Sequence, residues 1–174
     1  MTIKLKKPEV PVPATIRELP LTEWGYFKPW FVEADDFRVV DGNKAWLSVS
    51  GQACWICGKP FTPGEYALVG DRNSVNQRVY TEPPCHKDCA EYAMQVCPFI
   101  LYPNAKRREA NLEAEQTLDH SNQNRSVKIN KENPGEYFVT VVSQFTYHKQ
   151  KQVMTHQGEH VLEQQHWIGG TRQS

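Results

Sequence analysis

The stretch that decides the fold runs from CWICG at residues 54–58 to CHKDC at residues 85–89. Each end holds two metal-ligand residues that are separated by two others. The four residues are Cys54, Cys57, His86 and Cys89. Three thiols and one imidazole at these spacings match the tetrahedral coordination of a structural Zn²⁺ ion. We therefore predict one structural zinc ion held by these four side chains.

The residues beside the two pairs suit this role. Gly58 directly follows Cys57 and permits the tight backbone turn of a zinc knuckle. From His86 onward, apolar residues recur every three or four positions, which predicts a helix that stops or kinks at Pro98. Residues three apart share one face of a helix, so His86 and Cys89 would point at the same ion. The positive end of the helix also favours the thiolate of Cys89.

Between the two pairs, the sequence predicts a β-hairpin over residues 61–81. Its strands are expected at 65–69 and 78–81, with a polar loop at 70–77. A knuckle, a hairpin and then a helix that carries the last two ligands is the treble-clef arrangement. The expected fold class is therefore α+β, with a treble-clef zinc core and flanking β segments.

Two further cysteines need a role. Cys85 and Cys89 are four positions apart and could also face one metal, which makes Cys85 an alternative to His86. Because Cys85 follows Pro84 and precedes the predicted helix, we favour His86. Cys97 lies two turns along that helix and is expected to be a small core residue. The odd total of five cysteines fits a metal site better than a disulfide framework.

Outward from the metal site, the 174 residues divide into four expected parts. These are a proline-rich extended arm (1–20), an aromatic β segment plus treble-clef zinc domain (21–103), an exposed helix and polar loop (104–135), and a C-terminal β-hairpin (136–174).

Within these parts, the pattern predicts several further elements. Short strands are expected at 30–33 and 37–40, whereas residues 44–49 suit either a helix or a strand. A strand at 136–148 is expected to pair with 159–168 across a polar connection.

Charge limits the function. Lys plus Arg and Asp plus Glu each total 20, so the chain does not have the basic excess of many nucleic-acid-binding domains. A local phosphate-binding patch is still conceivable, and its residues would be Arg78, Lys87, Lys106, Arg107 and Arg108. The sequence has no apolar run of the roughly 20 residues that a membrane helix needs, and its start lacks the apolar region of a secretory signal. We expect a cytoplasmic protein without membrane contact.

The sequence gives little support for a catalytic site. Treble clefs also occur in HNH nucleases, which need a catalytic His at the end of the hairpin. The predicted hairpin holds Asp71 and Asn73 but no His. Four later histidines lack a Cys or carboxylate that would complete a second metal site; they are His148, His156, His160 and His166. No catalytic residue is predicted.

Four motifs together resemble a known family. They are GYFKPWFV (25–32), DFRVVDGNKAW (36–46), CWICGKPF (54–61) and EPPCHKDCAEYAMQVCPF (82–99). The chain is similar over residues 19–105 to a family of small uncharacterised zinc-binding proteins of bacteriophages and actinobacteria. The resemblance implies the same four metal ligands and a phage or prophage setting, hence the host cytoplasm if the protein is phage-encoded. The sequence departs at GDRNSVNQRV (70–79), where family members often have an MCAVNR-like stretch.

A closed four-ligand zinc site has no open position for water or substrate, so it stabilises a fold and does not usually perform chemistry. The leading hypothesis is a non-enzymatic binding module, a phage-type accessory protein that contacts a host or phage protein. The alternative is a nucleic-acid-binding regulator that uses the local basic patch, and an HNH-like nuclease is the third. The sequence does not indicate the oligomeric state.

Overall fold

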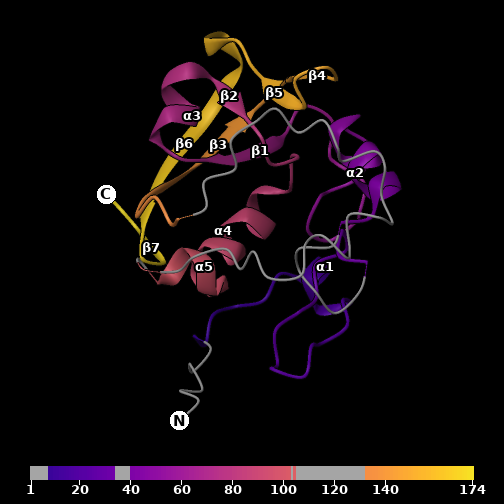
Figure 1. The fold of residues 1–174 in the computed structure, drawn as a ribbon, viewed down its shortest axis with the longest axis vertical. Helices are drawn as coiled ribbons and strands as arrows, with labels where there is room; N and C mark the ends of the chain where they lie inside the picture. Colours follow the sequence, from indigo (N-terminus) through magenta and orange to yellow (C-terminus); the bar gives the residue numbers. More distant parts are fainter. Residues whose placement is uncertain (1–7, 34–39, 103, 105–131) are drawn as a thin grey trace.

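A computed structural model describes residues 8–33, 40–102, 104 and 132–174 (Figure 1). The helices are α1 (Ala14–Arg17), α2 (Gly42–Val49), α3 (Arg72–Gln77), α4 (Lys87–Val96) and α5 (Pro98–Leu101). The strands are β1 (Tyr66–Gly70), β2 (Val79–Tyr80), β3 (Tyr137–Val142), β4 (Thr146–His148), β5 (Val153–Thr155), β6 (Val161–Ile168) and β7 (Thr171–Arg172). A short 3-10 turn covers Gly158–His160. Helices and antiparallel sheets combine as the predicted α+β class.

The strands form two antiparallel sheets. The larger has the order β1-β3-β6-β7, and the smaller has the order β2-β5-β4. Strand β3 pairs with β6 from Tyr137 opposite Trp167 to Val142 opposite Val161, which confirms the predicted pairing of 136–148 with 159–168. The single long strand was wrong, because the chain leaves the larger sheet after Val142 and continues as β4 in the smaller one. The predicted polar connection contains β5.

The predicted hairpin over residues 61–81 was also wrong. Strand β1 pairs with β3, and β2 pairs with β5, so the two expected hairpin strands belong to different sheets. The expected polar loop between them contains α3, because the Asp71 side chain caps this helix by accepting a hydrogen bond from the Ser74 amide at 2.8 Å. Strand β1 instead forms a single bridge from Ala67 to Cys85, just before α4.

The aromatic N-terminal segment contains less strand than predicted. Val32 and Val40 form one isolated bridge, and residues 34–39 lie outside the described part. Residues 44–49 belong to helix α2, because the Asp41 carboxylate accepts hydrogen bonds from two backbone amides at its start, at 2.9 and 3.1 Å. Most of the helix and loop expected at 104–135 also falls outside the described residues.

Two groups of buried side chains form the core. The larger core cluster contains the three cysteines predicted to bind metal and joins α4 to β1 and β3. Its members come from far apart in the chain, such as Ile16, Val139 and Trp167. Helix α4 lies below the larger sheet in Figure 1 and contacts β1 and β3. The smaller core cluster consists of Val49, Leu68, Tyr80, Val142 and Met154.

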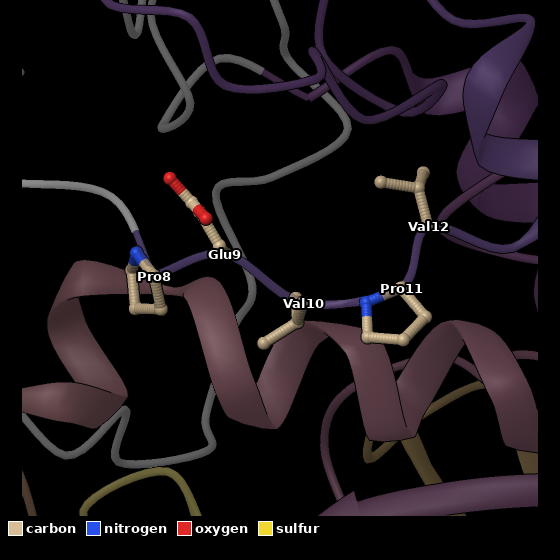
Figure 2. A pocket seen from close by; sticks show the side chains of 5 residues that line it. All are labelled: Pro8, Glu9, Val10, Pro11 and Val12. Carbon is tan, nitrogen blue, oxygen red and sulfur yellow. The ribbon is translucent and has the colours of Figure 1, made fainter.

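The proline-rich arm is part of this packing where the structure describes it. Val10 and Val12 pack against the larger core cluster, and Ile16 of α1 is 1% exposed within it. Figure 2 shows residues 8–12 running along the length of a helix, and these residues line a shallow pocket. Among the described residues, no helix is both long enough and apolar enough to cross a membrane.

Candidate metal centre

The two ligand pairs meet in space. One donor atom from each of Cys54, Cys57, His86 and Cys89 lies within 4.8 Å of every other. The three cysteines are buried, and His86 is partly exposed. In the described part of the chain, this is the one group of three or more His, Cys, Asp or Glu side chains so arranged. Its donor set and spacing are compatible with a bound metal ion.

The knuckle that carries the first pair is closed by its own backbone. The Cys54 amide donates to the Lys59 carbonyl, and the Gly58 amide donates to the Cys54 carbonyl, both at 2.8 Å. Gly58 has a φ of +73°, and a Cβ atom there would lie 2.5 Å from the ring of Trp30. The position therefore needs glycine for its left-handed backbone and for its close contact with the indole.

The second pair is positioned by the start of α4. His86 is the N-cap residue, so Cys89 follows in the first turn of the helix. The His86 amide donates to Cys54 Sγ at 3.3 Å, which ties this helix end to the knuckle. His86 Nδ1 lies 3.3 Å from Cys57 Sγ and 3.9 Å from Cys89 Sγ.

The outer contact of His86 selects its ligand atom. His86 Nε2 lies 3.0 Å from the Pro60 carbonyl oxygen, which can only accept a hydrogen bond. Nε2 therefore carries a proton, and Nδ1, which faces the thiols, is the nitrogen that would bind a metal ion once its own proton is lost. A carbonyl that orients a histidine in this way is typical of metal sites.

The remaining cysteines lie apart from this group. Cys85 is buried, with its Sγ 3.6 Å from the Ala67 carbonyl, and burial raises the pKa of its thiol well above the usual value. The structure therefore groups His86, and not Cys85, with Cys54, Cys57 and Cys89. Cys97 ends α4 and is only half-buried, so its expected place in the core was wrong.

The four groups compete for protons. Hydrogen bonds from the Cys54 and Cys89 thiols lower the pKa of Cys57 strongly. Interactions with the Cys54 and Cys57 sulfurs raise the pKa of His86 to about 11, and the same two sulfurs raise the pKa of Cys89. Negative charge concentrated on one thiolate thus holds protons on its neighbours. A divalent cation would replace those protons, as metal binding by thiols generally does.

Two contacts around the ligands were not predicted. Thr15 Oγ1 of α1 lies 3.7 Å from Cys89 Sγ, which places the N-terminal arm beside the site. The ring of Phe61 packs 5.1 Å from the His86 ring. The arm contact joins residues 74 positions apart, and a threonine in a proline-rich segment offers no sequence signal for it.

The structure describes two of the five residues of the predicted basic patch, Arg78 and Lys87. Lys87 forms an ion pair with Glu163, which also accepts a hydrogen bond from Arg172 at 3.1 Å. Arg78 ends α3 in a left-handed conformation. Its guanidinium lies beside Gly158, within 3.4 Å of where a Cβ atom added to that glycine would be. Lys106, Arg107 and Arg108 lie outside the described residues.

The four later histidines are likewise engaged separately. His148 contacts Thr155, His156 contacts the Gln157 carbonyl, His160 contacts Ser143, and His166 contacts Glu136.

Comparisons of the chain with protein-family models, curated proteins and solved structures find no match.

Proposed function

We propose that Cys54, Cys57, His86 and Cys89 hold one structural Zn²⁺ ion in a centre of the treble-clef kind. The observation that carries this proposal is the convergence of four soft or borderline donors within 4.8 Å, three of them on buried residues. Four protein ligands complete a tetrahedral zinc site and leave no position for a substrate. In this centre the usual hairpin is reduced to β1 and its bridge to Cys85.

A zinc ion at this position would stiffen the N-terminal aromatic segment. It would join the knuckle to α4, and both elements contact that segment. The Trp30 amide donates to the Ile56 carbonyl of the knuckle at 2.7 Å. The ring of Phe27 meets Tyr92 of α4 edge-on at 6.5 Å.

This segment presents a closed loop, which we call the Trp24 loop (residues 20–28). The Thr22 amide donates to the Tyr26 carbonyl at 2.7 Å, and the Lys28 amide donates to the Pro20 carbonyl at 2.8 Å. Trp24 is 65% exposed and Leu21 is 61% exposed. An exposed indole on a loop with a fixed backbone is the kind of anchor that dominates the energy of many protein–protein interfaces.

We therefore infer a non-enzymatic binding module, of the phage accessory type, whose Trp24 loop contacts a protein partner. Two observations favour this over the alternatives. Lys87 is paired with Glu163, which weakens a basic patch for nucleic acid. Asp71 serves as the cap of α3, which weakens a nuclease role for its carboxylate.

The metal part of the proposal is tested by elemental mass spectrometry of the purified protein. We expect about one zinc per chain, with none in Cys57→Ser and the full amount in Cys97→Ser. A protein purified without metal that also fails to take up added Zn²⁺ would refute the centre.

The partner part is tested by affinity capture with three forms: the unchanged protein, Trp24→Ser and Leu162→Ser. Leu162 is the matched control, because it is 59% exposed and lies on β6, outside the Trp24 loop. We expect a protein that binds the unchanged form and Leu162→Ser but is lost from Trp24→Ser, followed by the same result with that protein purified. Equal capture by all three forms would refute the loop as the binding site. Metal-dependent cleavage of nucleic acid that is lost in Asp71→Asn would refute the non-enzymatic function.

A further inference from the structure

A different surface, formed by α2 and the β4–β5 hairpin, combines aromatic rings with lysines. We call it the Trp46 surface and define it by Trp46, Phe145, Tyr147, Lys149 and Lys151. Trp46 is 53% exposed on α2, and its ring meets that of Tyr147 edge-on at 6.5 Å. Lys149 Nζ lies 5.9 Å from the centre of the same indole. Figure 1 shows β4 near the end of α2.

The rings of this surface are held in place from below. Phe145 and Tyr147 are half-buried and pack against the smaller core cluster. Phe145 also meets Tyr66 at 5.1 Å, and Tyr66 meets Phe61 at 5.0 Å, so the row of aromatic side chains continues toward the metal centre. Rings fixed by packing lose little conformational entropy when a ligand stacks on them.

The charge of the surface has one sign. Residues 42–64 and 137–158, which include α2 and both hairpin strands, contain no Asp or Glu. Lys149 and Lys151 are exposed in the turn between β4 and β5, and Lys149 lies over the Trp46 ring. The charged side chains of these two segments are all lysines, Lys44, Lys59, Lys149 and Lys151, so the segments carry a net positive charge. Such a surface attracts a polyanion even though the net charge is zero.

We propose that the Trp46 surface binds single-stranded nucleic acid. Bases would stack on Trp46 and Tyr147, and Lys149 and Lys151 would contact phosphates. Aromatic platforms with flanking basic residues are the usual means of binding single strands with little sequence preference. A duplex hides its base faces inside the stack, and an acidic peptide has the charge without the flat bases. This surface uses neither the Trp24 loop nor the residues of the predicted basic patch.

The test is fluorescence anisotropy of a labelled oligothymidylate of about 15 nucleotides, titrated with zinc-loaded protein at about 50 mM salt. We expect saturable binding that weakens by about tenfold in Trp46→Ala, because a stacked base is lost, and by much less in Trp46→Phe. Replacing Lys149 and Lys151 with Gln should make the salt dependence shallower: the negative slope of log K against log salt should decrease in magnitude by about 1.4, at roughly 0.7 per phosphate contact.

Three results would overturn the proposal. They are absence of binding at low salt, equal affinity of Trp46→Ala and the unchanged protein, and equal binding of polyglutamate or of a duplex of the same length. Zinc content and circular dichroism of each variant show whether it is folded. Trp24→Ser serves as the cross-control: it should keep the affinity for the oligonucleotide, and Trp46→Ala should keep the protein partner, so the two proposals can fail separately.

Discussion

The two core clusters are built in different ways. The larger one contains the three cysteines that we propose as metal ligands, and its other members are Trp55, Cys85 and residues of α1, α4 and the larger sheet. The smaller one has five members, and their only polar groups are the Tyr80 hydroxyl and a thioether; that hydroxyl donates to Thr140 at 3.0 Å. The smaller cluster can form by apolar burial alone. The larger one contains three of the four proposed metal ligands, and the fourth, His86, lies next to it. Without a cation, these four groups compete for protons. Its stability should therefore depend on metal, and that of the smaller cluster should not.

The largest expected effect is the loss of one metal ligand. Cys57→Ser removes a ligand, and binding of structural zinc contributes about 10–16 kcal/mol in small zinc-dependent folds at neutral pH. We expect hydrogen exchange to accelerate over the knuckle and α4, with a much smaller change in β4 and β5. Cys97→Ser is the control, because its sulfur lies outside the ligand group. Uniform loss of protection in both clusters would mean that they form one cooperative unit.

The reverse experiment weakens the smaller cluster. Met154 is fully buried there, so Met154→Ala should lower the free energy of unfolding by about 2–5 kcal/mol through lost contacts and a cavity. Zinc content should stay at that of the unchanged protein. Chemical denaturation and elemental analysis of the same sample measure both quantities. Zinc lost in proportion to stability would contradict the separation of the two clusters.

An intermediate effect is expected at the knuckle glycine. Gly58→Ala adds a methyl group to a backbone with φ of +73° and places it against the Trp30 ring. The matched control is Gly64→Ala, where φ is +84° and no described atom lies within 4 Å of the added Cβ. Backbone strain of about 1–3 kcal/mol applies to both, whereas the steric clash applies only to Gly58. We expect faster zinc release to a chelator in Gly58→Ala alone. Equal release rates in Gly58→Ala and Gly64→Ala would show that the Trp30 ring moves aside to make room for the methyl group.

The smallest effect should come from a surface network outside both clusters. Arg72 of α3 donates two hydrogen bonds to Glu136 at 2.6 Å, and His166 contacts the same carboxylate at 2.8 Å. These contacts, Arg72 first, lower the pKa of Glu136. A lowered folded pKa means that the stabilisation is complete above the unfolded value of about 4.3 and is lost as pH falls through the folded value.

Glu136→Gln should therefore lower the melting temperature slightly at every pH from about 8 to about 5, and the difference should shrink as pH falls further and the carboxylate is protonated. Thermal unfolding of both proteins across this range measures the difference. Arg72→Gln should reproduce it, because it removes the other half of the ion pair. A difference that disappears well above pH 5 would contradict the assignment to Glu136.

Local sequence signals were enough where one segment determines its own structure. The CxxCG turn at Cys54–Gly58 and the helix after His86 follow from spacing and periodicity, and the structure contains both. The pairing of β3 with β6 followed from alternation. Helix α2 could have been decided as well, because Asp41 stands at the N-cap position before it, and Asp71 does the same for α3.

Strand partners were predicted less well, because they depend on distant segments. Strand β1 was predicted to pair with β2, the next strand in the sequence. It pairs instead with β3, which lies about seventy residues later. Nothing in the apolar pattern of Tyr66–Gly70 distinguishes these partners. The contact of Thr15 with Cys89 is of the same kind, since only the folded chain brings the arm to the site.

The pairing of β1 with β3 has a consequence for biosynthesis. Ribosomes deliver a chain from its N-terminus, so all four proposed metal ligands emerge before β3, the partner of β1, has been made. During that interval the apolar strand Tyr66–Gly70 has a free edge, which is a hazard for aggregation. The bridge from Ala67 to Cys85 is already available, and it lies one residue from a metal ligand. That bridge uses the edge of β1 opposite to the one that β3 takes, so metal captured by the nascent chain would hold β1 beside α4 before its partner strand is translated. We therefore expect metal starvation to reduce the yield of folded protein more than it harms protein already made.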